Sequence, residues 1–359
     1  MDLPGIVSLL KEKGLYRAPG KYRKEMRYGE IHYGSGYPIT GLIKFLGYYD
    51  ESLKIANFPS ISLNTDVSEA YSAFMISKDN GNDTAVVEGE NSPNITKKAM
   101  TAINVFKNLY DIKGSFHFYL RIKRKYAGAK GLGESAAVAA AASRSLVSAL
   151  FEKEALKDSN FISIVARLAS GSGSKSVAGP LSLWLTAPAV SHEGSFSLNL
   201  RKEIDDIFLC AVPIRDSVST AEAHNTVIKS PFYQQWSRLQ FDAVYSIISR
   251  GGYSAQIIEN ATTNTYLMHS VLISTGKLLW NQDTLRAMGI VEDMRRIGRL
   301  IGFSIDTGPS VLVMADREDL IKEFKERYNG ECIDASVPNG APDIPSSFVE
   351  SAERYFAKH

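Results

Sequence analysis

The chain of 359 residues has few cysteines, almost no net charge and no long hydrophobic run. Its two cysteines, Cys210 and Cys332, exclude a thiolate metal cluster, argue against a disulfide framework and favour a reducing compartment. The 41 basic and 39 acidic residues nearly balance, so no overall field favours nucleic acid or an anionic membrane. No apolar run approaches the roughly 18–20 residues that span a bilayer, and the N-terminal segment lacks the pattern of a signal peptide. We therefore expect a cytoplasmic protein without a nucleic-acid or membrane partner.

The rest of the composition is that of an ordinary globular protein, with 44% hydrophobic and 22% charged residues. Its length favours about two domains. The polar segment 191–206 contains the expected boundary, which divides the chain into an extension at residues 1–30, a domain at 31–195 and a domain at 196–359. In the extension, an apolar patch predicts a short helix. The basic stretch after it is either a solvated arm or an arm that binds a phosphate or a partner.

Glycine and alanine are concentrated in residues 126–145, which read YAGAKGLGESAAVAAAASRS. The alanines predict a helix that lies close to another layer of the protein. Gly131 and Gly133 belong to a loop that enters this helix, and such a loop presents backbone N–H groups to an anion. Glu134, followed by Ser135, places a carboxylate where a bound phosphate is expected. This carboxylate has to be explained by any function that uses the loop.

The same glycines superficially resemble the fingerprint of a dinucleotide-binding domain. That fold needs an acidic ribose ligand at the end of a second strand, about 20 residues later. The acidic residues there, Glu152 and Glu154, lie in a helical pattern. The pattern therefore argues against a Rossmann fold.

Two lysines lie among apolar or small residues. Lys44 interrupts the apolar run 37–47, where a lysine costs free energy unless its ammonium reaches water or an anion. Lys175 lies in the Ser/Gly segment 170–176, and the apolar run 180–185 follows closely. We predict a tight loop at 170–176, whose hydroxyls, N–H groups and ammonium suit a carboxylate or a phosphate.

Hydrophobic periodicity and capping residues predict the flanking elements. Ser92 and Pro93 are expected to begin a helix that carries Lys98. Asp316 is the expected N-cap of a helix near the C-terminal end. Helices are predicted at 161–169, 231–250, 282–300 and 316–328, and strands at 60–63, 116–122, 208–214, 303–305 and 310–314.

Three segments, together with the glycine loop, carry a resemblance to one family. They read GLIKFLGYYDESLKIANFPSISL, RLASGSGSKSVAGP and FSIDTGPSVLV, and with the loop they run from about residue 37 to residue 315 in the family's order. The chain resembles the decarboxylases of the mevalonate pathway, within the superfamily of galactokinase, homoserine kinase, mevalonate kinase and phosphomevalonate kinase (GHMP). Lys44 falls on the family's N-terminal lysine, and Asp306 falls on the aspartate of its T-x-D-A-G-P-N motif. Residues 1–30 lie outside the resemblance.

The resemblance implies an α+β fold of two domains, with the active site in the cleft between them. The N-terminal domain would resemble domain 2 of ribosomal protein S5. Relatives use ATP to phosphorylate the tertiary 3-hydroxyl of a mevalonate that carries a 5-phosphate or 5-diphosphate. Loss of that phosphate and of CO2 then gives an isopentenyl product. Relatives are often dimers, so a homodimer is possible here.

The chain departs from the family at three positions. The serine-rich ATP loop of relatives is replaced by Glu134-Ser135-Ala136-Ala137, and a carboxylate about 4 Å from one phosphate charge costs roughly 4 kcal/mol at an effective dielectric of about 20. Lys175 stands where relatives have an arginine, and it lacks the planar fork that holds a carboxylate bidentately. Tyr48 stands where relatives that bind a diphosphate often have a second lysine, which favours a single phosphate on C5.

One substrate accounts for all three departures. We expect mevalonate 3,5-bisphosphate to be converted to isopentenyl phosphate, CO2 and phosphate, with no cofactor and no metal ligand. Because Asp306 is retained, an ATP- and Mg²⁺-dependent decarboxylase of phosphomevalonate or diphosphomevalonate is the alternative. A non-catalytic binder of an anionic isoprenoid precursor is a lesser alternative. The expected catalytic residues are Asp306, Lys44 and Lys175, the substrate-binding residues are Ser170, Ser172, Ser176, Tyr48 and Lys98, and the degenerate phosphate loop comprises Gly131, Gly133, Glu134 and Ser135.

Overall fold

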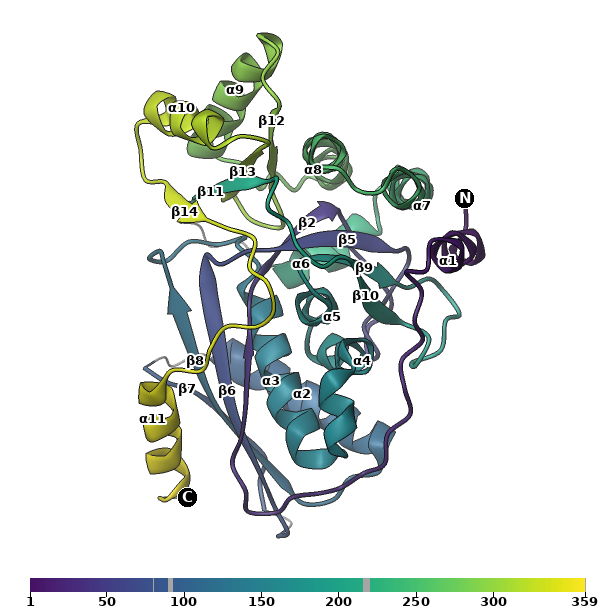
Figure 1. Ribbon diagram of the computed structural model, residues 1–359, viewed down its shortest axis with the longest axis vertical. Coiled ribbons are helices and arrows are strands. Elements are labelled where there is room, and N and C mark those ends of the chain that lie inside the picture. The colour runs from purple at the N-terminus through teal and green to yellow at the C-terminus, as the bar shows by residue number, and fades with distance from the viewer. Residues whose placement is uncertain (80, 90–92, 216–219, 359) are drawn as a thin grey trace.

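The chain folds into two α+β units that share an interface above the helical layer of the first (Figure 1). The computed structural model describes residues 1–79, 81–89, 93–215 and 220–358. The elements of the first part of the chain are α1 (Leu3–Glu12), β1 (His32–Gly36), β2 (Ile39–Ile43), β3 (Tyr48–Asp50), β4 (Ile55–Ala56), β5 (Ser60–Asn64), β6 (Ser68–Ser77), β7 (Thr84–Val87), α2 (Pro93–Tyr110), β8 (Ser115–Arg124), α3 (Glu134–Leu150), α4 (Ser159–Ala169), α5 (Gly171–Ala178), β9 (Leu181–Leu185) and β10 (Phe196–Arg201). Those of the second part are β11 (Phe208–Val212), α6 (Thr220–Val227), α7 (Tyr233–Arg250), α8 (Ser254–Ile273), α9 (Gln282–Arg296), β12 (Ile301–Ser304), β13 (Val311–Ala315), α10 (Glu318–Tyr328), β14 (Ile333–Ala335) and α11 (Ser346–Phe356).

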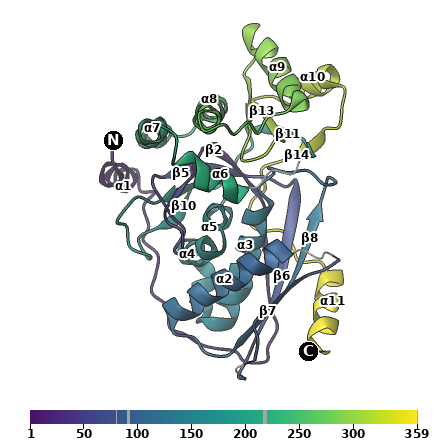
Figure 2. The same ribbon diagram turned by 180° about the vertical axis from the view of Figure 1, so that it is seen from behind.

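Two four-stranded sheets enclose the helices of the first unit. One sheet has the order β1-β6-β8-β7 and the other has the order β10-β9-β5-β2, while β3 and β4 form a separate pair. Helices α3, α4 and α5 lie between the two sheets, and α2 crosses this layer on the far side (Figures 1 and 2). The alanine-rich helix α3 packs directly on β1 and β6.

The close packing predicted for the alanines is confirmed by two glycines of β1. A Cβ on Gly34 would lie 2.3 Å from the carbonyl oxygen of Ala141, and one on Gly36 would lie 2.5 Å from that of Ala137. Neither position has room for a side chain. Small residues on both partners therefore set the short distance between α3 and this sheet.

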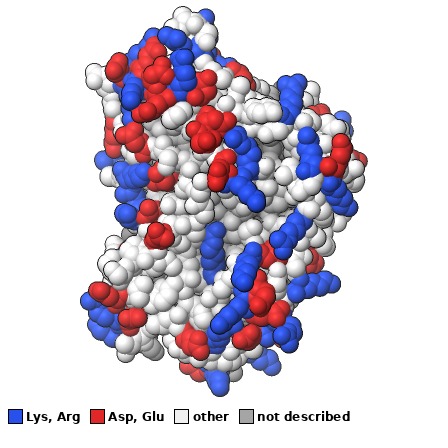
Figure 3. Space-filling view, viewed as in Figure 1, with Lys and Arg blue, Asp and Glu red and all other residues white. Residues whose placement is uncertain are grey.

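The second unit has a sheet of order β12-β13-β11-β14, against which α9 and α10 pack. Helix α8 contacts both β12 of this sheet and β2 of the first unit. It therefore connects the two units directly above the segment that carries Lys44. Acidic and basic side chains are interspersed on the face viewed in Figure 3.

The expected boundary between residues 195 and 196 falls inside a strand pair, because β10 is hydrogen-bonded to β9. In addition, the C-terminal helix α11 returns to the first unit and covers the outer face of β6 and β8, where Phe348 packs on Tyr71 and Tyr119. We propose that the first unit extends through Arg201 and includes α11.

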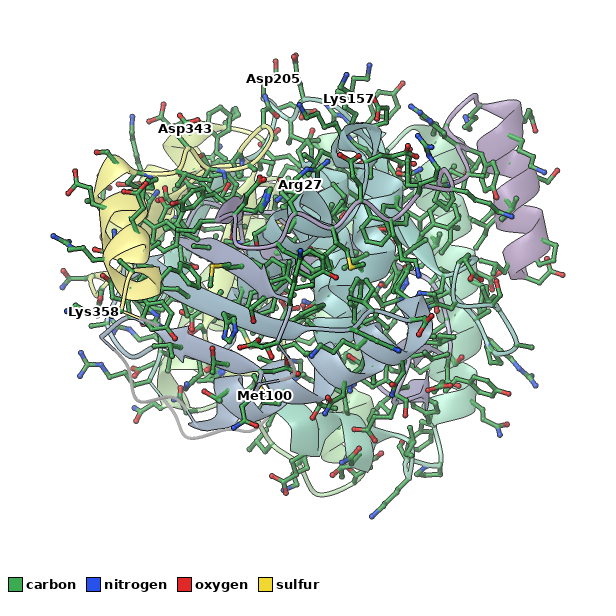
Figure 4. The ribbon with its side chains drawn as sticks, turned by 90° about the horizontal axis from the view of Figure 1, so that it is seen from below. Arg27, Met100, Lys157, Asp205, Asp343 and Lys358 are labelled. Atoms are coloured by element: carbon green, nitrogen blue, oxygen red, sulfur yellow. The ribbon has the colours of Figure 1, made fainter. Side chains whose placement is uncertain are left out.

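The N-terminal extension begins with the predicted helix, α1, whose apolar face packs against α7. The basic side chains Arg17, Lys21, Arg23 and Lys24 of the stretch after it are exposed, while its backbone and Arg27 are bonded to the first unit. Arg27, labelled in Figure 4, donates to the carbonyls of Ser148 at 2.6 Å and Phe151 at 2.9 Å. The backbone N–H of Gly20 and the hydroxyl of Tyr22 both donate to Asp158.

Other predictions differ from the structure at particular elements. The segment 170–176 is mostly helical, because Gly171 begins α5. Helix α10 is capped by Arg317 rather than by Asp316. Helix α8 was not predicted, and Ser92 lies outside the described residues. None of the helices within the described residues is long and apolar enough to cross a membrane.

Candidate active site

The closest pairing of predicted residues joins Lys44, just after β2, with Asp306, just after β12. Lys44 Nζ donates to Asp306 Oδ1 at 2.6 Å, and the backbone N–H of Gly41 lies 3.2 Å from the same oxygen. The Lys44 side chain is 2% exposed and that of Asp306 is 23% exposed. Burial lowers the pKa of Lys44, and the carboxylate of Asp306 opposes this shift. The carboxylate thus compensates for the burial of the ammonium and remains accessible from outside.

A buried hydroxyl supports this ion pair. Ser304, the last residue of β12, accepts hydrogen bonds from Lys44 Nζ at 2.6 Å and from the hydroxyl of Thr40 at 2.7 Å. It donates to the carbonyl of Gly41 at 2.7 Å. Beneath the pair, His269 of α8 lies 3.3 Å from the carbonyl of Ile305 through Nε2. Burial first, and Lys44 second, lower the pKa of His269 to about 3, so this imidazole is neutral.

Lys175 of α5 lies near the same ion pair and has a weaker set of partners. Its Nζ donates to Ser60 Oγ at 2.8 Å and lies 5.0 Å from the ring centre of Phe45. Burial lowers the pKa of Lys175 to about 7, Asp306 raises it and Lys44 lowers it further. These interactions bring two lysines and one carboxylate within electrostatic range of one another. With both lysines protonated, the cluster has one excess positive charge and is suited to an anion.

Helix α5 also explains why a glycine-rich sequence is helical here. A Cβ on Gly173 would lie 2.5 Å from Cβ of Ala139 in α3. A Cβ on Gly171 would lie 2.9 Å from both the Trp184 ring and the Tyr48 hydroxyl. The glycines thus permit close packing of a buried helix, although the same composition is typical of a loop.

The predicted serines of this segment lie on α5 or at its start. Ser170 and Ser172 hydroxyls are 3.0 Å apart, and Ser176 donates to the carbonyl of Tyr37 at 2.6 Å. Tyr48 accepts a hydrogen bond from the N–H of Gly171, and burial raises its pKa. Its ring stacks on His224 of α6, with ring centres 4.6 Å apart. Tyr48 therefore fills, with an aromatic pair, the place at which relatives often carry a second lysine.

The glycine loop lies on the other side of Asp306. Gly133 has φ 73° and precedes α3, which begins at Glu134. A Cβ on Gly131 would lie 2.9 Å from Cα of Gly308, so the loop backbone contacts the backbone after Asp306. Ser135 is exposed. The loop thus enters α3 as predicted, but Gly131 packs against the segment that follows Asp306.

Glu134 has partners that were not predicted. Arg124, the last residue of β8, forms an ion pair with it through Nε and through Nη2, the latter at 2.9 Å from Oε2. The hydroxyl of Tyr126 donates to Oε1 at 3.3 Å. The carboxylate at this helix N-terminus is therefore held by the protein's own side chains.

Several sequence candidates are not brought to this cluster. The side chain of Lys98 lies outside the described residues. Two cations of β8 are also held away from it. Arg121 is paired with Glu88 and donates to Ser347 and Ser351 of α11. Lys123 is paired with Glu69 at 3.2 Å.

Other functional groups were missed because a sequence gives them no distinctive signal. Thr40, Ser60 and Ser304 are hydroxyl residues in buried strands, where such residues are common. His269 lies on α8, where buried residues such as Thr262 obscure the hydrophobic period. Among the described residues, no group of three His, Cys, Asp or Glu side chains is placed to hold a metal ion.

Comparisons with known proteins show which family the chain belongs to. The family described as the diphosphomevalonate decarboxylase-like N-terminal domain matches residues 36–197. Mevalonate 3,5-bisphosphate decarboxylase of Thermoplasma acidophilum is 34% identical over 354 residues, which cover 98% of this chain and 87% of that protein. The chain belongs to the mevalonate decarboxylase family.

A second member of this family, mevalonate 3,5-bisphosphate decarboxylase of Thermoplasma volcanium, is 30% identical over 355 residues, with 99% of this chain and 95% of that protein covered. Both alignments therefore include most of residues 1–30, which we had placed outside the resemblance. The solved mevalonate diphosphate decarboxylase from Enterococcus faecalis is 21% identical, has a TM-score of 0.73, and covers 86% of this chain and 98% of its own. This likeness confirms the predicted α+β fold of the GHMP superfamily.

Proposed function

We propose that this decarboxylase acts on mevalonate 3,5-bisphosphate without ATP. The C1–C2 bond breaks, its electron pair forms the C2=C3 double bond, and the C3–O bond breaks with its pair leaving on phosphate. The products are isopentenyl phosphate, CO2 and inorganic phosphate. Two relatives that this chain matches at 34% and 30% identity carry the name of this activity.

The observation that carries the proposal is the state of the phosphate loop. In a nucleotide site, backbone N–H groups at the start of α3 would face the triphosphate. Here the Glu134 carboxylate lies at that helix terminus and is held by Arg124 and Tyr126. Gly131 packs on Gly308, which leaves no space for a phosphate between the two backbones. These residues do not fit a triphosphate, whereas the E. faecalis enzyme binds ATP.

In this mechanism the two lysines stabilise negative charge on the departing 3-phosphate. Both are almost completely buried, so they act in a medium where a charge is weakly screened and already oriented. Asp306 holds Lys44 in place, and its negative charge stabilises the positive charge that develops at C3. Because the 3-hydroxyl is already phosphorylated, no base is needed to deprotonate it.

Tyr48 supports a single phosphate on C5. Its hydroxyl accepts a hydrogen bond from the N–H of Gly171, and its ring is stacked on His224. Neither the hydroxyl nor the ring of Tyr48 offers a cation for a second phosphate. Ser170 and Ser172, at the start of the helix that carries Lys175, would offer hydrogen bonds to substrate oxygens. The one hydroxyl proton of Ser176 is donated to Tyr37, so Ser176 would accept a hydrogen bond rather than donate one. A homodimer and a cytoplasmic location complete the proposal.

The experiment that tests the proposal supplies three candidate substrates separately. Mevalonate 3,5-bisphosphate is tested without nucleotide, and mevalonate 5-phosphate and mevalonate 5-diphosphate are tested with ATP and Mg²⁺. Turnover of the first alone supports the proposal. ATP-dependent turnover of mevalonate 5-phosphate or mevalonate 5-diphosphate supports the nucleotide-dependent alternative. Tight binding without turnover of any of the three substrates supports the non-catalytic alternative.

A further inference from the structure

Ser304 is the only residue among those described whose side chain touches Lys44 Nζ besides Asp306. Its hydroxyl is 1% exposed and lies between strands of the two units, since β12 belongs to the second and β2 to the first. It accepts from Lys44 and Thr40 and donates to the carbonyl of Gly41. One donor and two lone pairs are all that a serine hydroxyl has. Each is used once, so the orientation of the hydroxyl is fixed.

The contact with Gly41 links this hydroxyl to the carboxylate as well. The carbonyl of Gly41 accepts from Ser304, and the N–H of the same residue lies 3.2 Å and 3.3 Å from the two oxygens of Asp306. A Cβ on Gly41 would lie 3.0 Å from both Asp306 Oδ1 and Lys44 Cδ. The ion pair therefore has little freedom to shift against the strand. Ser304 is the group that ties its ammonium end to both units.

We propose that Ser304 is a positioning residue, which aims the Lys44 ammonium at the departing phosphate by accepting one of its three N–H bonds. This assignment rests on the reaction proposed above. An ammonium fixed by Ser304 and Asp306 retains one N–H for the substrate. Without the hydroxyl, Lys44 Nζ turns toward Asp306 and loses that fixed direction.

The charged groups around Lys44 determine what removal of the hydroxyl does. Asp306 favours the ammonium form, Lys175 of α5 opposes it by charge repulsion, and His269 of α8 is neutral and adds no charge. Ser304 accepts from the ammonium and therefore favours the protonated form. Its loss moves the deprotonation of Lys44 to lower pH. In the substrate complex, bound phosphate keeps Lys175 protonated, so the alkaline limb of kcat reports Lys44.

The test compares Ser304→Ala with Thr40→Val by phosphate release from mevalonate 3,5-bisphosphate. Both variants remove one hydroxyl from the same cluster, but only Ser304 touches Lys44. We expect S304A to lower kcat roughly ten- to a hundredfold, the loss typical of a hydrogen bond to a charged group. It should also move the alkaline limb of kcat to lower pH. T40V should lower the melting temperature without moving the alkaline limb of kcat. Ser304→Thr keeps a hydroxyl at this position, so its kcat should stay near that of the unmodified protein.

Ser304→Cys covers the case in which S304A does not fold, because a thiol of similar size accepts hydrogen bonds only weakly. It should show the same displaced limb. An unmoved limb in folded S304A or S304C, or equal limbs in S304A and T40V, overturns the positioning role. Absence of turnover in the unmodified protein is a different outcome, because it contradicts the reaction itself rather than the role of Ser304.

Discussion

Glu134 at the start of α3 is ion-paired with Arg124 at the end of β8, ten residues earlier in the chain. The two side chains are roughly one quarter exposed, at 29% and 26%. The pair lies at a helix N-terminus that, in an ATP-using relative, would face phosphate. The carboxylate in the first turn of α3 is thus paired with an arginine of the same chain.

Replacing Glu134 with serine should create weak ATP affinity. The variant removes a negative charge from the helix N-terminus and supplies the hydroxyl found in relatives. Calorimetric titration with ATP and Mg²⁺ should detect binding to E134S and none to the unmodified protein. Alanine at the same position is the matched control, because it removes the charge without adding the hydroxyl. Tight ATP binding by the unmodified protein would refute the account of the loop.

The same substitution should have a modest cost in stability. A carboxylate in the first turn stabilises a helix by about 0.3–1 kcal/mol, and its loss also removes the ion pair with Arg124. We expect the free energy of unfolding of E134S to fall by about 1–2 kcal/mol in urea titrations. Substitution of both Arg124 and Glu134 by uncharged residues should cost less than the sum of the single changes, because neither charge is then left alone.

Lys175 should give substrate capture an alkaline limit. Burial lowers its pKa to about 7 in the free protein, so the ammonium that receives phosphate is lost as pH rises through that value. We expect kcat/KM to fall above about pH 7. Bound phosphate keeps Lys175 protonated in the substrate complex, so this fall should be absent from kcat, whose alkaline limb at higher pH reports Lys44. Lys175→Arg should remove the fall of kcat/KM above about pH 7, because a guanidinium stays charged. Lys157→Arg, at an exposed lysine, is the control. A pH-independent kcat/KM in the unmodified protein from pH 6 to 9 would contradict this assignment.

Lys175 should also make the stability of the free protein depend on pH in a defined direction. Between about pH 7 and about pH 10, the unfolded chain keeps a proton on this lysine that the folded chain has lost. The free energy of unfolding therefore rises with pH in this window as the buried lysine loses its charge in the folded state. Below about pH 7 both states hold the proton, and Lys175 adds no pH dependence. Lys175→Met should be more stable than the unmodified protein at pH 6, with the difference shrinking toward pH 10. Urea unfolding at several pH values measures this, and a constant difference would contradict it.

Asp306→Asn should nearly abolish turnover with the fold intact. The amide keeps an oxygen that can accept from the N–H of Gly41. It removes the negative charge that stabilises both the positive charge developing at C3 and the ammonium of Lys44. We expect kcat to fall by a factor on the order of 100–1,000, the size found when one preorganised electrostatic group is removed. Far-UV circular dichroism checks the fold. Normal activity in folded D306N would remove Asp306 from the mechanism.

Much of this site was predictable because its main groups are charged residues in unusual surroundings. Lys44 interrupts an apolar run and Glu134 occupies a helix start, so both depart from their local pattern. Asp306 lies in a turn where aspartate is ordinary, and only the family's motif singled it out. Periodicity predicted most of the helices and the strands β5, β8, β11, β12 and β13, but not the ten-residue strand β6. The family resemblance then placed these residues in one cleft.

The remaining features depend on contacts between distant segments. The sequence spacing of Thr40 and Ser304 gives no sign that their hydroxyls meet at 2.7 Å. Gly171 and Gly173 have a loop composition, and only the close approach of Trp184 and Ala139 explains their place in a helix. Helix α11 returns to the first unit through packing on β6 and β8, which no local pattern specifies.

The central claim is that no nucleotide is required, and one reaction tests it most directly. The purified protein is incubated with mevalonate 3,5-bisphosphate in the presence of a metal chelator and without nucleotide, while phosphate and CO2 are measured together. We predict equimolar release of the two, with isopentenyl phosphate as the organic product and no release by D306N. No release from the bisphosphate, together with ATP-dependent turnover of mevalonate 5-phosphate, would contradict the claim.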